Sequence, residues 1–273
     1  MSHAYYQYDK EQLLRAPKLP LICMPDNAQV FRAMAEEMVS EIEANEKAGK
    51  HTVFICPVGP VGQYPYFVEM VNGRNLSLKN TWFINMDEYL DDDRKWVPMD
   101  HPLSFRGFME RTVYSQIKPE LVMPPEQRVF PDPDNTGYIP DLIERLGGVD
   151  IAFGGIGING HVAFNEADPS MTPEEFLAQK TRVLAITPET RTANAIGDFN
   201  GALEDMPRYC VTIGIFEIAH ARKIRLGVFR NWHRAVARRT AYGEPTAEFP
   251  VSLLVNHPDI TLRLPDYVAA LND

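Results

Sequence analysis

The chain has 273 residues, of which 45% are hydrophobic, and carries a formal net charge of −10 at pH 7. This acidic balance argues against nucleic acid and anionic membrane surfaces as partners, because both require a basic face. The three cysteines, Cys23, Cys56 and Cys210, are far apart and odd in number, so they indicate neither a disulfide framework nor a metal cluster.

The N-terminal segment carries no recognisable export signal. Residues 1–10 contain neither the basic nor the apolar region of a secretory signal, and no stretch of the chain approaches the roughly 18 apolar residues of a membrane span. We therefore expect a cytoplasmic protein. Residues 1–19 are polar and rich in aromatic side chains, which predicts an extension that precedes the folded domain.

Strand-like apolar runs alternate with helical periodicity from residue 21 onward. In the first half we expect a strand at 21–24, a helix at 27–48 capped by Asp26, a strand at 52–56, a helix at 64–71, a strand at 82–86, and helices at 103–117 and 139–146. In the second half we expect strands at 149–153, 181–186, 209–213, 224–229 and 260–264, and a helix at 233–242.

This alternation predicts an α/β fold built from βαβ units, with a mainly parallel sheet and helices on both of its faces. No repeat and no low-complexity linker divides the chain, so residues 20–273 are predicted to form a single domain.

The segment Gly154–Glu166 is the most informative stretch of the chain. It follows an apolar strand, turns through several glycines, and then presents a histidine and a carboxylate. Glycine lets backbone pass close to a ligand because it has no Cβ. Open α/β sheets build their active sites at the ends of strands in this way. The pattern therefore predicts a functional site that includes His161.

A second candidate lies at the end of the strand predicted at 82–86, where Asp87 and Glu88 are adjacent. In an extended chain neighbouring side chains point in opposite directions, so only one of the two carboxylates is expected to face a site. That carboxylate would serve as a general base. The alternative interpretation is a solvated acidic loop, which the acidic residues at 91–93 also suit.

His161 suits proton transfer near neutral pH, and a partner on its second ring nitrogen would fix its tautomer. Asn159 stands two residues before it and Glu166 five residues after it. A lone histidine is often only a surface or core residue, but the surrounding glycines favour a functional interpretation. The chain has no Walker motif and no spacing of histidines and cysteines that is typical of zinc sites.

Three segments together resemble the glucosamine-6-phosphate deaminase family. They are Asn85–Tyr89, residues 101–109 (His-Pro-Leu-Ser-Phe leading to Phe-Met), and above all Gly160–Glu166 (Gly-His-Val-Ala-Phe-Asn-Glu). The last run distinguishes the deaminases from the related 6-phosphogluconolactonases, and the shared order covers residues 20–270. The resemblance implies the modified Rossmann-like fold of the group that also contains ribose-5-phosphate isomerase.

The resemblance also implies an activity: conversion of an aldose 2-amino sugar or its phosphate to the ketose, with release of ammonia and without a metal or cofactor. Asp87 would be the base that moves a proton between C2 and C1, and His161, held by Glu166 and Asn159, would assist opening of the sugar ring. Substrate contacts are expected at Gly59, Gly62, Gln63, Glu88, Gly155, Ala163, Arg191 and His233. The family includes monomers and hexamers, so a homo-oligomer is compatible with the resemblance.

Three features depart from the family pattern. Asn159 replaces an aspartate, and an amide supplies no negative charge. The loop at 57–63 reads Pro-Val-Gly-Pro-Val-Gly-Gln where the family has a phosphate loop rich in glycine and threonine; Pro60 has no N–H, and the valines have no hydroxyl. Ile196 and His233 stand where an arginine and a lysine would hold the phosphate.

These departures leave several functions open. The substrate either lacks the 6-phosphate or carries another group there, or else one of Arg182, Arg191, Arg230 and Arg234 takes over the clamp. A sugar-lactone hydrolase, a simple sugar isomerase on the same scaffold, and a catalytically impaired sugar-binding protein are the remaining alternatives.

Overall fold

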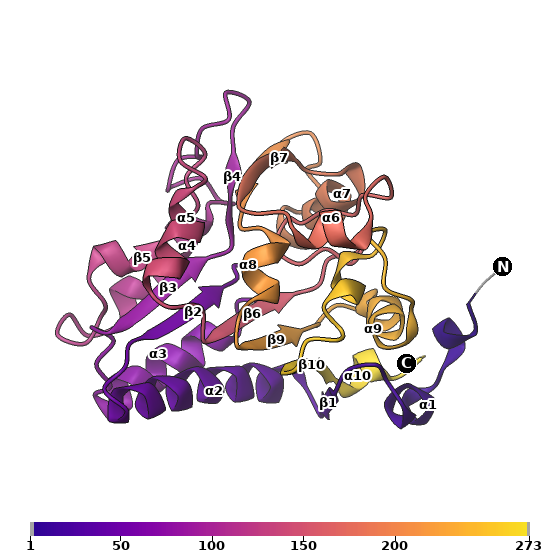
Figure 1. Cartoon of the computed structure of the whole chain (residues 1–273), viewed down its shortest axis with the longest axis horizontal. Coiled ribbons are helices and arrows are strands. Elements are labelled where there is room, and N and C mark those ends of the chain that lie inside the picture. The colour runs from indigo at the N-terminus through magenta and orange to yellow at the C-terminus, as the bar shows by residue number, and fades with distance from the viewer. Residues whose placement is uncertain (1–2, 272–273) are drawn as a thin grey trace.

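The computed structural model describes residues 3–271 and has a central parallel sheet of seven strands, in the order β1-β10-β9-β6-β2-β3-β5 (Figure 1). Its strands are β1 (Leu21–Met24), β2 (Thr52–Cys56), β3 (Thr81–Asn85), β5 (Arg128–Val129), β6 (Ile151–Gly155), β9 (Lys223–Gly227) and β10 (Ile260–Pro265). The α/β class with a mainly parallel sheet is confirmed.

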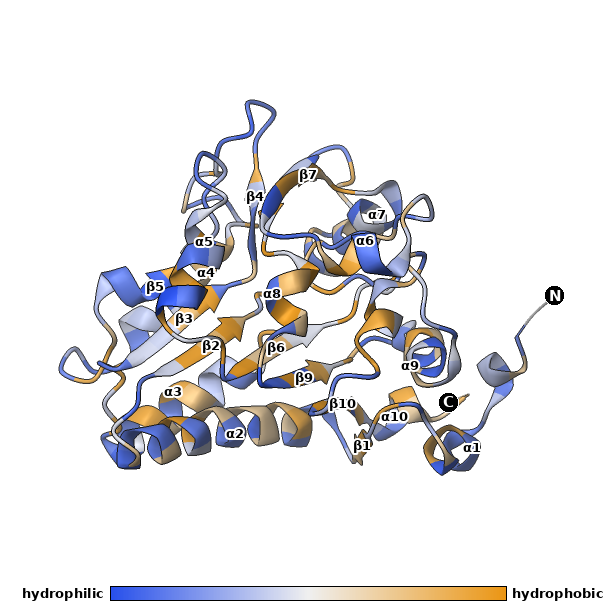
Figure 2. Ribbon diagram, viewed as in Figure 1, coloured by the Kyte–Doolittle hydropathy of each residue, from blue (hydrophilic) through white to orange (hydrophobic). Residues whose placement is uncertain are grey.

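Alternating side chains of the central strands enter two separate hydrophobic cores. From β2, Phe54 and Cys56 pack with the helices α2 (Asn27–Lys47) and α3 (Gln63–Arg74), while Val53 and Ile55 pack on the opposite face. The opposite core receives side chains from α5 (Tyr138–Arg145), α8 (Ile215–Ala219) and α9 (His233–Tyr242). Figure 2 shows the resulting concentration of apolar residues in the strands and on the inner side of the helices. Helices therefore cover both faces, as predicted.

A second sheet of three antiparallel strands lies beyond one end of the main sheet, in the order β4-β8-β7. Its strands are β4 (Asp87–Leu90), β7 (Arg182–Ala185) and β8 (Tyr209–Thr212). Met86 joins the two sheets: its amide donates to the carbonyl of Cys56, and its carbonyl accepts from the amide of Ile213. Periodicity located β7 and β8 but did not predict β4 as a strand. It also did not show that the three form a separate sheet, because pairing is not encoded in the pattern of one strand.

The five predicted helices are present at the predicted positions, and some of them differ in length. The helix expected at 103–117 is α4 (Phe105–Thr112) followed by a 3-10 turn, Tyr114–Gln116, and Ser104 caps it by accepting from the amide of Gly107. Asp26 caps α2 as predicted, accepting from the amide of Gln29. The remaining helices are α1 (Lys10–Arg15), α6 (Pro173–Leu177), α7 (Pro188–Asp198) and α10 (Asp266–Ala269), with 3-10 turns at Ala4–Gln7, Pro125–Gln127 and Pro250–Leu253.

The N-terminal segment packs against α9 of its own chain. The buried guanidinium of Arg238 donates to the carbonyls of Tyr8 and Ala269, and the Tyr242 hydroxyl donates to the carbonyl of Gln12. Both ends of the described chain therefore meet at one end of the molecule (Figure 1). Between residues 3 and 271 no helix is long and apolar enough to cross a membrane.

Candidate active site

A cavity of about 630 Å³ opens at the carboxyl ends of β2, β3, β6 and β9, between the two sheets. This is where open α/β sheets place their ligand sites. Among the residues named from the sequence, those that line the cavity are Gly59, Gly62, Asp87, Gly155, His161, Ala163 and His233. The side chains of Gln63, Glu88, Asn159, Glu166 and Arg191 lie outside its lining.

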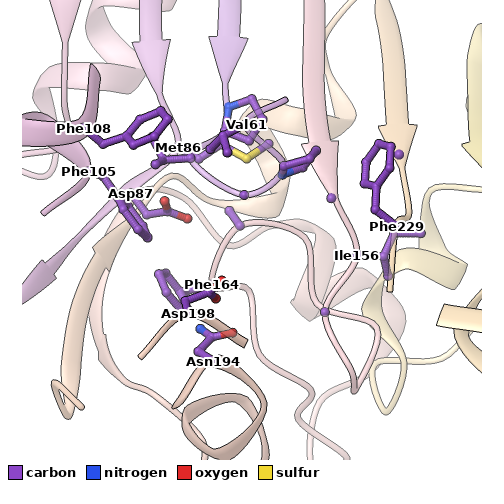
Figure 3. A pocket seen from close by; sticks show the side chains of 18 of the residues that line it. Val61, Met86, Asp87, Phe105, Phe108, Ile156, Phe164, Asn194, Asp198 and Phe229 are labelled. Carbon is purple, nitrogen blue, oxygen red and sulfur yellow. The ribbon is translucent and has the colours of Figure 1, made fainter. Parts of the chain in front are cut away.

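Asp87 begins β4 and is 6% exposed. Figure 3 shows its carboxylate pointing into the cavity, beside Phe105 and across from Phe164. Burial raises the pKa of Asp87 well above its usual range, and the neighbouring charge of Glu88 adds to the shift. A carboxylate whose proton affinity is raised in this way is suited to take a proton from carbon.

Glu88 points away from the cavity, as the strand geometry predicts for a residue next to Asp87. Its fully buried carboxylate accepts hydrogen bonds from the amides of Phe105 and Arg106, at 2.9 and 2.8 Å, and from the Ser104 hydroxyl at 3.0 Å. The Arg106 guanidinium lies 3.2 Å from it. Glu88 therefore anchors the N-terminus of α4. Its expected role as a substrate contact is corrected, because it does not line the cavity.

The turn after β6 places His161 on the cavity wall. A Cβ on Gly157 would lie 1.9 Å from the His161 ring, so only glycine lets the ring lie over the backbone there. Gly160 has φ +84° and a Cβ on it would strike Phe249. These two glycines explain why the segment around His161 is rich in glycine.

A polar network fixes the orientation of the His161 ring. Asn159 Nδ2 donates to Glu166 Oε2 at 2.8 Å, which leaves Asn159 Oδ1 to accept from His161 Nδ1 at 2.7 Å. The ring is thereby held with its proton on Nδ1, and Nε2 is left to exchange protons with a ligand. Asn159 thus keeps the geometry of the expected aspartate without its charge.

Glu166 is the buried carboxylate of this network. It accepts from the hydroxyls of Thr187 and Thr190 at 3.2 and 3.0 Å, and lies 3.4 Å from His161 Nδ1. Burial acts to raise the pKa of Glu166, but the hydrogen bonds from His161, Asn159 and Thr190 outweigh it, and the net shift is downward. Glu166 therefore holds a negative charge close to the imidazole. The sequence did not identify the two threonines as parts of this network.

The end of the cavity formed by residues 57–62 and 227–233 carries little positive charge. His233 accepts from the amides of Phe229 and Arg230 through Nδ1, at 2.8 and 2.7 Å, and its Nε2 lies 2.9 Å from the Ile156 carbonyl. Burial, with a contribution from Arg230, lowers the pKa of His233 to about 3. Its imidazole is therefore neutral and cannot act as a cation for phosphate.

The four arginines considered as a replacement clamp have different positions. Arg182 donates to Asn165, Arg191 to the carbonyls of Leu203 and Met206, and Arg234 to the carbonyl of Tyr267. Only Arg230 lines the cavity, and its guanidinium lies 2.6 Å from the Asp198 carboxylate. Ile196 is 72% exposed and does not line the cavity.

Several lining residues could not be identified from sequence periodicity. Phe105 and Phe164 stack at 6.4 Å between ring centroids, and the hydroxyl of Tyr89 accepts from Asn194 at 3.0 Å. Asn194 and Asp198 come from α7, which the sequence did not predict as a helix (Figure 3). The capping pattern Thr187-Pro188, with Glu189 in the first turn, was the signal that could have revealed it.

The neutral state of His233 has a measurable consequence for stability. In the unfolded chain a histidine protonates near pH 6.5, whereas folded His233 stays neutral down to about pH 3. Below pH 6.5 the unfolded state therefore binds the extra proton, and stability falls as the pH is lowered. We expect the wild type to lose about 2 kcal/mol from this residue between pH 7 and pH 5, and His233→Gln to lose correspondingly less, measured by urea unfolding. Equal losses in both proteins would contradict this assignment.

Sequence comparisons relate the chain to one group of enzymes. It is 32% identical over 216 residues to the glucosamine-6-phosphate deaminase of Rhodopirellula baltica, covering 78% of this chain and 81% of the relative. It is 29% identical over 245 residues to that of Thermoanaerobacter pseudethanolicus, covering 88% and 92%. No protein-family model matches the chain.

Structure comparisons agree at the level of the fold. A monomeric glucosamine-6-phosphate deaminase superposes with a TM-score of 0.80 at 24% identity, covering 93% of this chain and all of that one. The 6-phosphogluconolactonase from Trypanosoma cruzi superposes with a TM-score of 0.68 at 17% identity, covering 93% and 97%.

Proposed function

Because the chain belongs to the glucosamine-6-phosphate deaminase family, we propose that it isomerises and deaminates a 2-amino-2-deoxy aldose that carries no 6-phosphate. The proposal rests on the side chains that line the cavity: an acid–base pair is present, and positive charge is scarce. Asp87 and His161 both line it, and Arg230 is the only lysine or arginine in its lining among residues 3–271.

The proposed chemistry begins with opening of the sugar ring. His161 Nε2 takes the proton of the O1 hydroxyl and returns a proton to the ring oxygen as the C1–O5 bond breaks. The Asn159–Glu166 network keeps the imidazole in the tautomer that this transfer needs. The product of this step is the open-chain aldehyde.

Asp87 then moves a proton between two carbons of the open chain. Its carboxylate takes the proton from C2 while the ammonium group gives up one proton and O1 gains one, which forms an enolamine. Asp87 then delivers the C2 proton to C1, which gives a protonated imine at C2. Water adds to C2 and ammonia leaves, so the net reaction consumes one water and yields a ketose and ammonia. The acid–base role requires ionised Asp87, and the ammonium group of an incoming amino sugar favours that ionisation by charge pairing.

The charges of the cavity favour an unphosphorylated amino sugar. Its lining carries the carboxylates of Asp87 and Asp198, and the single guanidinium, Arg230, is paired with Asp198. A phosphate dianion would have to approach both carboxylates and compete with Asp198 for Arg230. An amino sugar without phosphate is a cation and meets the opposite sign of charge.

The proposal predicts a substrate preference. In a coupled assay for ammonia, we expect kcat/KM for glucosamine to exceed that for glucosamine 6-phosphate by about tenfold or more, equivalent to roughly 1.4 kcal/mol. Asp198→Asn frees Arg230 and should raise kcat/KM for the phosphorylated sugar alone. Exposed Asp205 is the matched control, because Asp205→Asn removes a carboxylate outside the cavity. Preference of the wild type for the 6-phosphate would overturn the proposal.

A further inference from the structure

The cavity extends beyond the acid–base pair into a wall of apolar side chains. We call this wall the distal subsite and define it by Phe31, Val58, Val61 and Phe229. Phe31 comes from α2, the valines from the loop between β2 and α3, and Phe229 from the segment after β9. Figure 3 shows Phe229 beside Ile156, on the other side of the cavity from Asp87.

Close contacts hold the aromatic part of the distal subsite in place. The rings of Phe31 and Phe229 stack with their centroids 4.1 Å apart and an interplanar angle of 20°. A Cβ on Gly62 would lie 2.4 Å from the Phe31 ring, and a Cβ on Gly227 would lie 2.8 Å from the Phe229 ring. Both rings therefore depend on neighbouring glycines for their positions, and the wall is preformed.

The order of atoms in the sugar directs its C6 toward this wall. Asp87 has to reach C1 and C2, and His161 has to reach O1 and the ring oxygen. In a hexose, C6 is attached to C5, which lies on the far side of the ring oxygen from C1. In such a pose the substituent on C6 would extend away from C1 and C2. The loop of the distal subsite closes the cavity next to Gly155, whose ideal Cβ would lie 2.8 Å from the carbonyl oxygen of Gly59.

The polar groups beside the wall are uncharged backbone amides and the ion pair formed by Arg230 and Asp198. In the described part of the chain, the amides of Gly59, Val61 and Gly62 donate no hydrogen bond, so they are available to a ligand oxygen. Arg230 and Asp198 neutralise one another at 2.6 Å. Valines and phenylalanines supply the rest of the surface, which matches an uncharged group with an apolar part and a hydrogen-bond acceptor.

We propose that the distal subsite binds an uncharged acyl group carried on O6 of the amino sugar. This inference rests on the proposed function. The ester carbonyl would accept from the loop amides, and the apolar part would pack between Val61 and the Phe31–Phe229 pair. Cavities of about 300–1,000 Å³ hold ligands of drug size, so the volume of about 630 Å³ accommodates a substituted hexosamine.

The test compares glucosamine with 6-O-benzoylglucosamine in the assay for ammonia. We expect kcat/KM to be about tenfold higher for the benzoyl ester, mainly through a lower KM, because the ring leaves water for an apolar wall. Phe31→Ala should reduce this ratio toward one. Tyr138 is an exposed aromatic residue outside the cavity, and Tyr138→Ala should leave the ratio as in the wild type.

The outcomes separate the two proposals. Release of ammonia from glucosamine with no advantage for the ester, or an advantage that survives Phe31→Ala, overturns the distal subsite alone. Calorimetric titration of the full-length Asp87→Asn variant with each sugar measures the preference without turnover, and equal affinities there also overturn the subsite. Absence of ammonia from both sugars with the wild type overturns the proposed function.

Discussion

Replacement of Asp87 by asparagine lowers kcat for ammonia release by about 10³-fold, within the 10²–10⁴-fold range of a positioned acid–base group. The amide has nearly the same size and occupies the same place in β4, but it cannot accept the C2 proton. The sugar still binds, because the shape of the cavity is unchanged, but more weakly, because one opposite charge is lost. The measurement is single-turnover release of ammonia with the purified full chain.

The same substitution has the opposite effect on stability. Burial raises the pKa of Asp87 above its unfolded value of about 3.9, so the folded state binds more protons than the unfolded state in the range between the two pKa values. Stability therefore falls as the pH rises from about 3.9 through the folded pKa, and the loss is complete above it. Asp87→Asn removes this loss and should unfold at an equal or higher urea concentration at pH 8.

Exposed Asp92 gives the matched control for this variant. Asp92→Asn removes a carboxylate from the loop after β4 and leaves both turnover and stability as in the wild type. An Asp87→Asn protein that turns over at the wild-type rate would contradict the assignment of the base. Loss of turnover together with lowered stability would show that Asp87 is mainly a structural residue.

Replacement of Glu88 by alanine lowers the free energy of unfolding by about 3 kcal/mol. The substitution leaves five donors around an empty space: the Ser104 hydroxyl, the amides of Tyr89, Phe105 and Arg106, and the Arg106 guanidinium. Four of them belong to the start of α4, which carries Phe105 and Phe108 of the cavity wall. Urea unfolding at pH 7 measures the loss.

Variants of the two neighbouring acids, Glu88 and Asp87, should differ in their effects on folding and on turnover. Glu88→Ala should impair folding of α4, whereas Asp87→Asn should spare folding and stop the chemistry. Glu88→Gln keeps part of the hydrogen bonding and should fall between wild type and Glu88→Ala in stability. A Glu88→Ala protein of wild-type stability with weakened sugar binding would instead return Glu88 to the substrate contacts.

Local sequence patterns predicted most of the fold and the main side chains of the site. The alternation of strands and helices gave the parallel sheet, because period-2 and period-3.6 patterns depend only on which face of each element is buried. Alternation likewise predicted that only one of Asp87 and Glu88 faces the site, but it did not say which of them does. The glycine-rich run led to His161, since Gly157 is required by the His161 ring close by in the sequence, whereas the contact of Gly160 is with the distant Phe249.

Contacts between segments that are far apart in the chain could not be predicted from the sequence. In the antiparallel sheet, β4 pairs with β8, whose residues 209–212 are far along the chain from residues 87–90, and nothing in a single strand specifies its partner. The lowered pKa of His233 follows mainly from its burial, which only the folded chain produces. The same holds for Asp198, whose pairing with Arg230 decides the charge of the cavity.

The most direct test of the account follows the hydrogen on C2 of the sugar. Glucosamine deuterated at C2 is incubated with the wild-type protein, and ammonia release and the position of the label are followed together. If Asp87 moves that hydrogen while His161 opens the ring in the same cavity, turnover slows relative to unlabelled sugar and the label leaves C2 for C1 or for solvent. Ammonia released at an unchanged rate, with an aldose product that keeps the label on C2, would contradict the account.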